Sequence, residues 1–80
     1  MPTAFLTIKP KLMFKLFDIV RVINENYSSI GVHRGDTGTV LEIYDDKCCE
    51  VEFSDKNGMT YVLQTFCMKD LELKKHDETN

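Results

Sequence analysis

The chain has 80 residues, a formal net charge of −3, and 42% hydrophobic and 29% charged residues. A chain of this length forms one small domain with a modest core, and its ordinary composition excludes an intrinsically disordered protein. No apolar run approaches the roughly 20 residues of a membrane-spanning helix. The lysines near the start follow the apolar residues rather than precede them, so no signal peptide is expected.

The first part of the chain predicts an arm, a strand and a loop. Residues 1–16 contain two prolines, which interrupt regular structure, and are predicted to form an N-terminal arm. The segment FDIVRVI, residues 17–23, is typical of a strand with Val20 and Val22 on one face. The polar segment up to Asp36 has no apolar residues at helical spacing, so a loop is expected there.

Residues 34–36 read Arg-Gly-Asp, which matches a cell-adhesion tripeptide, and lie just before the segment TGTVLEIY. Short matches of this kind are weak evidence, and the Gly-Asp pair is typical of a turn. Gly38 follows within a run of β-branched residues, where glycine marks a sharp bend or a close backbone approach. The alternation breaks near Leu41 or Glu42, which predicts a β-bulge. The sequence therefore favours a turn that leads into a bent strand.

The segment CEVEF shows the cleanest alternation in the chain. It predicts a strand in which Cys49, Val51 and Phe53 face the core, while Glu50 and Glu52 face outward. Because every second residue is apolar and the others are charged, one face of this strand is expected to be buried and the other to remain accessible.

Two more strands are expected after this one. The Asn-Gly pair at residues 57–58 is a strong hairpin signal, and it leads into the strand MTYVLQ, residues 59–64. Residues 65–70 are predicted to form a short turn with one turn of 3₁₀-helix, and residues 71–74 a last short strand. The charged tail, residues 75–80, is expected to fray.

Five short strands without an α-helix predict an all-β fold. Small barrels bend their strands at glycines and bulges, which is the pattern around Gly38. The order of long loop, bent strand, two hairpins, short helical turn and final strand favours a small five-stranded SH3-like barrel over residues 17–74. An OB-like barrel is the alternative, although it normally needs more residues and a helix between its third and fourth strands.

The segments FDIVRV, GVHRGDTGTVLEIY, CEVEFSDKNG and DLEL carry a resemblance that runs from about Met13 to Leu73. They resemble a small uncharacterised bacterial domain family with the pattern Asp-hydrophobic-Val, Gly-Asp-x-Gly-Thr-Val, Val-Glu-Phe and Asp-x-x-Gly. The resemblance implies an SH3-like barrel. Proteins of this kind are often encoded beside small toxin-like proteins, so the resemblance also implies an immunity or antitoxin role.

No combination of side chains predicts catalysis, a cofactor or a metal. The two histidines, His33 in the loop and His76 in the tail, have no positioned nucleophile. Cys49 is expected in the core and Cys67 in a packing turn, since free cysteine is often buried. A zinc site needs two ligand pairs, whereas this chain has one adjacent pair of cysteines and one distant cysteine, so no zinc site is expected. Three cysteines, two of them adjacent, argue against a disulfide framework and favour a reduced, cytoplasmic location.

The charges divide unevenly along the chain. Residues 1–35 carry five basic and two acidic side chains, whereas residues 42–55 carry six acidic side chains and one basic. An acidic strand face keeps a protein soluble and discourages sheet-to-sheet pairing. The same face can dock a basic protein, with its charge speeding the encounter and an aromatic residue anchoring the complex. The predicted partner-binding residues are Glu42, Tyr44, Asp45, Asp46, Glu50, Glu52 and Asp55.

The predicted function is non-enzymatic: an immunity protein or antitoxin that binds and neutralises a cognate basic toxin of the nuclease type. The alternative is a small RNA- or transcription-associated barrel that uses the basic residues of the N-terminal half, Lys9, Lys11, Lys15, Arg21 and Arg34. The acidic pI of about 5.2 and the lack of a basic stripe with interleaved aromatics make nucleic acid the weaker prediction. A subunit of a larger enzyme is a third hypothesis.

Overall fold

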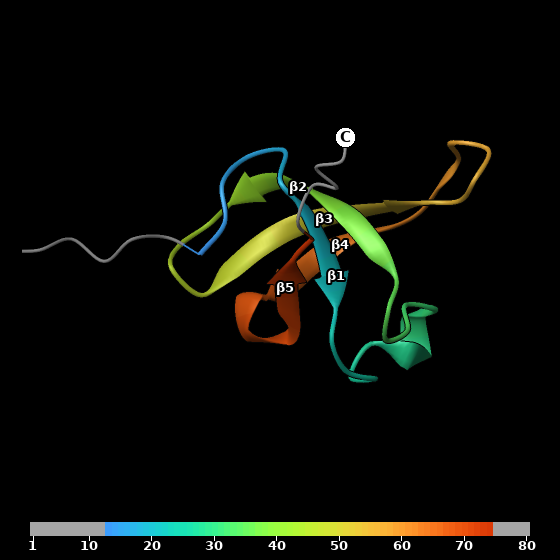
Figure 1. The fold of residues 1–80 in the computed structure, drawn as a ribbon, viewed down its shortest axis with the longest axis horizontal. Coiled ribbons are helices and arrows are strands. Elements are labelled where there is room, and N and C mark those ends of the chain that lie inside the picture. Colours follow the sequence, from blue (N-terminus) through green and yellow to red (C-terminus); the bar gives the residue numbers. More distant parts are fainter. Residues whose placement is uncertain (1–12, 75–80) are drawn as a thin grey trace, which may run out of the picture.

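The protein forms one curled antiparallel sheet (Figure 1). The computed structural model describes residues 13–74, which contain no α-helix. The elements in chain order are β1 (Ile19–Val22), the 3₁₀-helix η1 (Ser28–Ile30), β2 (Thr37–Ile43), β3 (Cys48–Ser54), β4 (Thr60–Cys67), the 3₁₀-helix η2 (Met68–Asp70) and β5 (Leu71–Leu73). The strand order is β4-β3-β2-β1-β5. The predicted all-β, five-stranded SH3-like fold is confirmed.

The connections between strands distinguish an SH3-like barrel from an OB-like barrel. A tight hairpin joins β3 to β4, where an OB-like barrel has a helix. The long polar loop joins β1 to β2, and η2 leads directly from β4 into β5. This order of connections is the one that the SH3-like prediction requires.

The inner face of the sheet carries one hydrophobic cluster. Val20 and Val22 of β1 are fully buried, as their alternation predicts. The other large, fully buried side chains are Val32, Val40, Cys49, Val51, Phe53, Phe66 and Met68. Because burying a Val, Phe or Met side chain contributes about 1.5–3 kcal/mol, this cluster is the main source of stability.

The packed part of the domain begins before residue 17. Phe14 is only 4% exposed and belongs to the core cluster. The Phe17 N–H donates to the carbonyl of Val40 at 2.7 Å, which ties this segment to β2. Residues 1–12 of the predicted N-terminal arm, residues 1–16, lie outside the described residues. The predicted tail, residues 75–80, also lies outside them.

Two predicted turns are confirmed by their glycines. Gly35 has φ = 95° and Gly58 has φ = 83°, both in the left-handed region that favours glycine. The Gly35 N–H donates to the carbonyl of Val22 at 2.8 Å, so the Arg-Gly-Asp tripeptide belongs to the turn before β2. The Gly58 N–H donates to the carbonyl of Asp55 at 2.9 Å and closes the β3–β4 hairpin.

Gly38 lies where β2 approaches atoms of β3 too closely for a side chain. A Cβ atom at this position would lie 2.7 Å from Val51 Cγ1, 2.8 Å from the Glu52 carbonyl oxygen and 3.0 Å from Phe53 Cδ2. The predicted close backbone approach is therefore confirmed, and it lets the sheet bend over its own core.

β4 is longer than the sequence analysis predicts. Residues 65–70 are expected to form a turn, but the strand continues to Cys67 and only Met68–Asp70 is helical. Phe66 lies opposite Cys49 and is fully buried, so it continues the inward-facing side of the strand. The prediction that Cys67 lies in a packing turn is wrong, because pairing with β3 extends the strand through that residue.

Candidate functional site

Three glutamates lie on the outer surface of β2 and β3. Glu50 is the cross-strand partner of Glu42 in β2 and of Thr65 in β4. Glu52, two residues further along β3, lies opposite Leu63 of β4. We call this surface, which carries Glu42, Glu50 and Glu52, the acidic face.

A β-bulge brings Glu42 onto the acidic face. Val40 points into the core, so strict alternation would also turn Glu42 inward. The register against β3 shifts between these two residues, which leaves Leu41 as the extra residue and confirms the predicted bulge. After the shift, Ile43 packs against the core and Glu42 stands opposite Glu50.

The carboxylates of β3 are held by hydroxyl groups from neighbouring elements. Glu50 Oε1 accepts hydrogen bonds from the Tyr44 hydroxyl and from Thr65 Oγ1, each at 3.0 Å. Glu52 Oε2 accepts one from Thr60 Oγ1. The bond to Glu50 raises the pKa of the Tyr44 phenol, so Tyr44 remains a donor. Both glutamates are half-buried and have fixed positions.

The three predicted aspartates lie in the turns at the two ends of β3. Asp45 Oδ1 accepts from the backbone N–H groups two and three residues further on, both at 2.8 Å, and these bonds lower its pKa. Asp55 Oδ1 accepts from the N–H groups two and four residues further on, at 2.9 and 3.0 Å. Asp46 is exposed. The structure thus brings the glutamates and Tyr44 together, whereas Asp45 and Asp55 stabilise turns.

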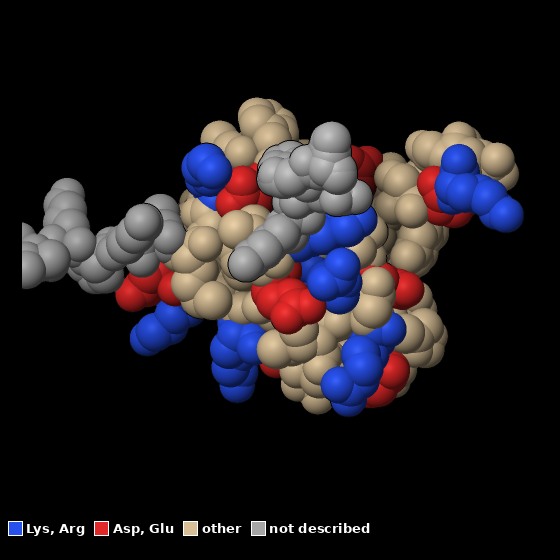
Figure 2. Space-filling view, in the orientation of Figure 1, with Lys and Arg blue, Asp and Glu red and all other residues tan. Residues whose placement is uncertain are grey.

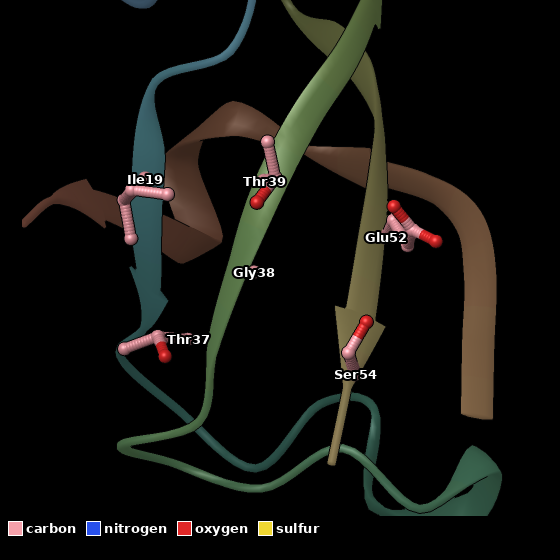
Figure 3. A pocket seen from close by; sticks show the side chains of 6 residues that line it. All are labelled: Ile19, Thr37, Gly38, Thr39, Glu52 and Ser54. Carbon is pink, nitrogen blue, oxygen red and sulfur yellow. The ribbon is translucent and has the colours of Figure 1, made fainter. Parts of the chain in front are cut away.

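A small pocket of about 110 Å³ adjoins the acidic face above Gly38 (Figure 3). Its lining comes from three neighbouring strands and consists of Ile19, Thr37, Gly38, Thr39, Glu52 and Ser54. Three residues with hydroxyl groups therefore line a hollow at one end of the acidic face, together with Glu52, whose carboxylate is held by Thr60 of β4. Such a lining offers hydrogen-bond acceptors to a lysine or arginine side chain.

A buried polar cluster lies beneath the long loop, and the sequence analysis missed it. Asp70 of η2 is only 5% exposed. Its Oδ2 accepts from the Tyr27 hydroxyl at 2.6 Å, and its Oδ1 from the amides of Asn24 at 2.8 Å and Asn26 at 3.3 Å. The Tyr27 oxygen accepts from the Cys67 N–H at 3.1 Å. Burial alone would raise the pKa of Asp70, but these hydrogen bonds hold it below its ordinary value.

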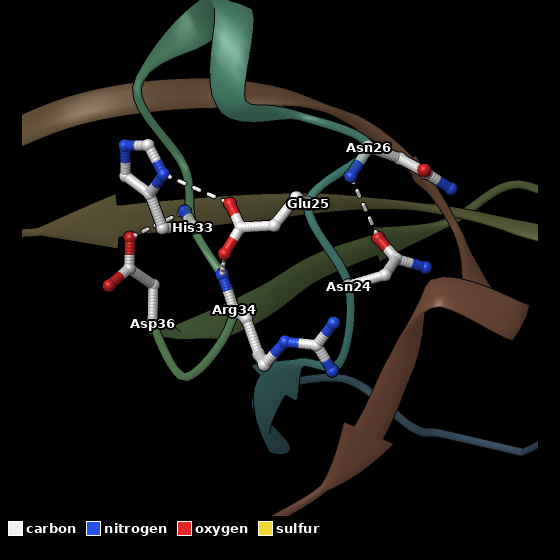
Figure 4. A network of polar contacts seen from close by, with 6 residues as sticks. All are labelled: Asn24, Glu25, Asn26, His33, Arg34 and Asp36. Atoms are coloured by element: carbon white, nitrogen blue, oxygen red, sulfur yellow. Dashed lines mark hydrogen bonds and ion pairs between the residues drawn. The ribbon is translucent and has the colours of Figure 1, made fainter.

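Polar contacts within the long loop fix its shape (Figure 4). The Glu25 carboxylate contacts His33 Nδ1 at 3.1 Å and accepts from the Arg34 N–H at 3.2 Å, and both contacts lower the pKa of Glu25. The His33 N–H donates to Asp36 Oδ2 at 2.9 Å. The Arg34 guanidinium donates to the carbonyl of Ile23 at 2.9 Å. His33 and Arg34 therefore serve the loop itself.

Two of the three described basic residues that a nucleic-acid-binding role would use, Lys15 and Arg21, are paired with carboxylates, whereas the Arg34 guanidinium donates to a backbone carbonyl. Lys15 Nζ lies 3.3 Å from Asp18 Oδ1. One guanidinium nitrogen of Arg21 lies 3.0 Å from Glu72 Oε2 on the neighbouring strand β5. Lys9 and Lys11, the other lysines predicted for a nucleic-acid-binding role, lie outside the described residues. Figure 2 shows Lys and Arg interspersed with Asp and Glu over the visible face.

The described residues offer little support for metal or nucleophilic chemistry. Burial raises the pKa of Cys49 to about 11, which suits a core residue rather than a nucleophile. Within residues 13–74, no group of three or more His, Cys, Asp or Glu side chains is placed to hold a metal ion. No helix in the same range is long and apolar enough to cross a membrane.

These observations define a small all-β domain with a five-stranded SH3-like sheet and an acidic outer face. A family model described as a domain of unknown function, DUF4926, matches residues 16–73. Because this match covers most of the chain, the protein belongs to the DUF4926 family, and the predicted membership of a small uncharacterised domain family is confirmed. Comparisons with curated proteins and with solved structures gave no match.

Proposed function

We propose that this domain is a non-enzymatic binding protein that neutralises a basic protein through its acidic face. The observation that carries the proposal is the placement of Glu42 directly opposite Glu50. Like charges directly opposite each other on neighbouring strands are destabilising. A lysine or arginine from a partner, placed between the two carboxylates, would convert this repulsion into attraction.

Tyr44 supplies the anchor that such an interface needs. Its side chain is 54% exposed, and its hydroxyl is held by Glu50 at 3.0 Å. A fixed aromatic side chain loses little conformational entropy on binding, and aromatic residues are enriched among those that dominate binding energy. Leu63, which is 51% exposed beside Glu52, adds apolar surface to the same area.

The resemblance described above supports a toxin as the partner, and the charge favours one of the nuclease type. A nuclease binds phosphates with basic residues, and carboxylates can occupy the same positions. The protein would then act as a cytoplasmic immunity protein or antitoxin. RNA binding finds less support, because the sequence pI is about 5.2 and Lys and Arg are interspersed with Asp and Glu over the visible face rather than gathered in a basic stripe.

Calorimetry tests this proposal with the protein encoded next to this chain as the probe, which the proposal expects to be basic. The test variant is Glu50→Gln with Glu52→Gln, which removes two charges but keeps an oxygen for each hydroxyl donor. If the carboxylates pair with desolvated cations, the double variant should bind about 2–5 kcal/mol more weakly.

The matched control changes the net charge by the same amount elsewhere. Asp77→Asn with Glu78→Gln, in the C-terminal tail, should leave the affinity as it is in the parent. If both double variants lost the same amount of binding affinity, overall charge alone would explain the loss, and the acidic face would have no special role. Equal affinity of the Glu50/Glu52 variant and the parent would mean that the acidic face is not the binding surface.

A further inference from the structure

Cys48 and Cys67 lie directly opposite each other on β3 and β4. The backbone groups of these residues point away from each other. The Cys48 N–H donates to Asp45 Oδ1 at 2.8 Å, and its carbonyl accepts from the Tyr44 N–H at 3.0 Å. The Cys67 N–H donates to the Tyr27 hydroxyl at 3.1 Å. The two cysteines therefore form a non-hydrogen-bonded pair within the antiparallel ladder.

The next pair along the ladder supports this assignment. The Met68 N–H donates to the carbonyl of Lys47 at 2.8 Å, and hydrogen-bonded and non-hydrogen-bonded pairs alternate along antiparallel strands. In a non-hydrogen-bonded pair the Cα atoms are about 4.5 Å apart and the side chains are closest. This separation lies within the range of about 4.4–6.8 Å that a disulfide spans.

We propose that Cys48 and Cys67 form a reversible cross-strand disulfide under oxidising conditions, while Cys49 remains a thiol. Cys67 is exposed and Cys48 is half-buried on the outer side of the sheet, so both are accessible from the same side. Cys49, although adjacent to Cys48 in sequence, points into the core and is fully buried. The site goes beyond the proposed function, since it requires no partner.

The oxidant is a small disulfide such as oxidised glutathione. The exposed Cys67 thiolate attacks one sulfur of the small disulfide and releases one small thiolate, which takes up a proton. The Cys48 thiol then loses its proton and its sulfur displaces the second small thiolate, which is protonated in turn. In sum, two protein thiols become one disulfide and one small disulfide becomes two thiols.

The surroundings of Cys48 set the conditions for this exchange. Burial, the charge of Asp45 and the neighbouring Cys67 thiol raise the pKa of Cys48. Because the thiolate is the reacting species, closure of the disulfide should accelerate as the pH rises. Closure of the disulfide should therefore be slow near neutral pH.

The test incubates the folded protein with oxidised glutathione above pH 8.5, the ordinary cysteine pKa being about 8.5. The protein is then denatured, alkylated and weighed by mass spectrometry. The number of alkylated cysteines should fall from three to one, and peptide mapping should join Cys48 to Cys67. Cys49→Ser should still form the disulfide, whereas Cys48→Ser and Cys67→Ser should not.

Three outcomes would overturn the proposal. The parent could keep three alkylated cysteines, it could carry only mixed disulfides with glutathione, or its disulfide could include Cys49. Dithiothreitol should restore all three thiols of the oxidised parent, and failure to do so would contradict reversibility.

Discussion

Asp70 accepts hydrogen bonds from three side chains that precede it by 43 to 46 residues. The donors Asn24, Asn26 and Tyr27 all belong to the loop between β1 and β2, so one carboxylate attaches that loop to η2. Since buried charges are costly unless they are fully hydrogen-bonded, this contact holds the loop only while each donor is present. The attachment of the loop to η2 therefore depends on a single side chain far away in sequence, in addition to the contacts within the loop.

Asp70→Asn should lower the free energy of unfolding by about 1–3 kcal/mol, because one of the loop donors then faces an amide N–H₂ group and loses its acceptor. Denaturant unfolding measures this change. Asp46→Asn, at an exposed position, serves as the control and should stay within about 0.5 kcal/mol of the parent. An unchanged denaturation midpoint for Asp70→Asn would contradict the role given to this cluster.

The same substitution should remove part of the pH dependence of stability. Folding lowers the pKa of Asp70, so the contribution of the carboxylate is fully present above the unfolded-state pKa of about 3.9. It is lost as the pH falls through the lower native pKa. The stability difference between the parent and Asp70→Asn should therefore shrink in acid, and a constant difference would contradict this account.

Gly38 provides a second test at the scale of one residue. Gly38→Ala should destabilise the fold by about 1–3 kcal/mol through overpacking, since the added Cβ would lie 2.8 Å from a backbone oxygen of β3. Gly38→Val should cost more than Gly38→Ala. The matched control is Thr37→Val at the neighbouring exposed position, and equal midpoints for Gly38→Ala and this control would contradict the close approach.

At the scale of elements, β3 is fixed by a turn at each end and by a neighbour on each side. The alternation in CEVEF, the Asn-Gly hairpin and the bulge in β2 were all predictable, because each depends on residues close together in sequence. The extension of β4 to Cys67 was not, because it depends on pairing with β3. The Asp70 cluster was equally hidden, since no local pattern relates η2 to the long loop.

The predicted partner-binding residues form two groups: Tyr44 and the glutamates lie on or beside the acidic face, whereas the aspartates lie in the turns at the ends of β3. Asp55→Ala should lower the free energy of unfolding by about 0.5–2 kcal/mol, because it removes two hydrogen bonds to the backbone of the β3–β4 turn. Affinity for the basic partner should not change, which calorimetry on the folded variant would check. If the affinity fell while the free energy of unfolding stayed the same, Asp55 would be part of the binding surface.

At the scale of the whole molecule, the sheet separates apolar and acidic side chains onto its two faces. The inner face carries the core, and the outer face of β2 and β3 carries three glutamates with an exposed tyrosine beside them. The basic residues Lys15 and Arg21 are paired at other places on the surface. The three glutamates of the acidic face are therefore one organised part of a surface that also carries other exposed carboxylates.

The association rate constant of the basic partner, measured by stopped flow at increasing salt, tests this surface most directly. The Debye length falls from about 10 Å at 0.1 M to about 3 Å at 1 M salt, so electrostatic steering should weaken steeply. The parent should show a strong decrease in rate with salt, and Glu50→Gln with Glu52→Gln should show a clearly weaker one. The same salt dependence for both proteins would contradict the claim that the acidic face guides and binds the partner.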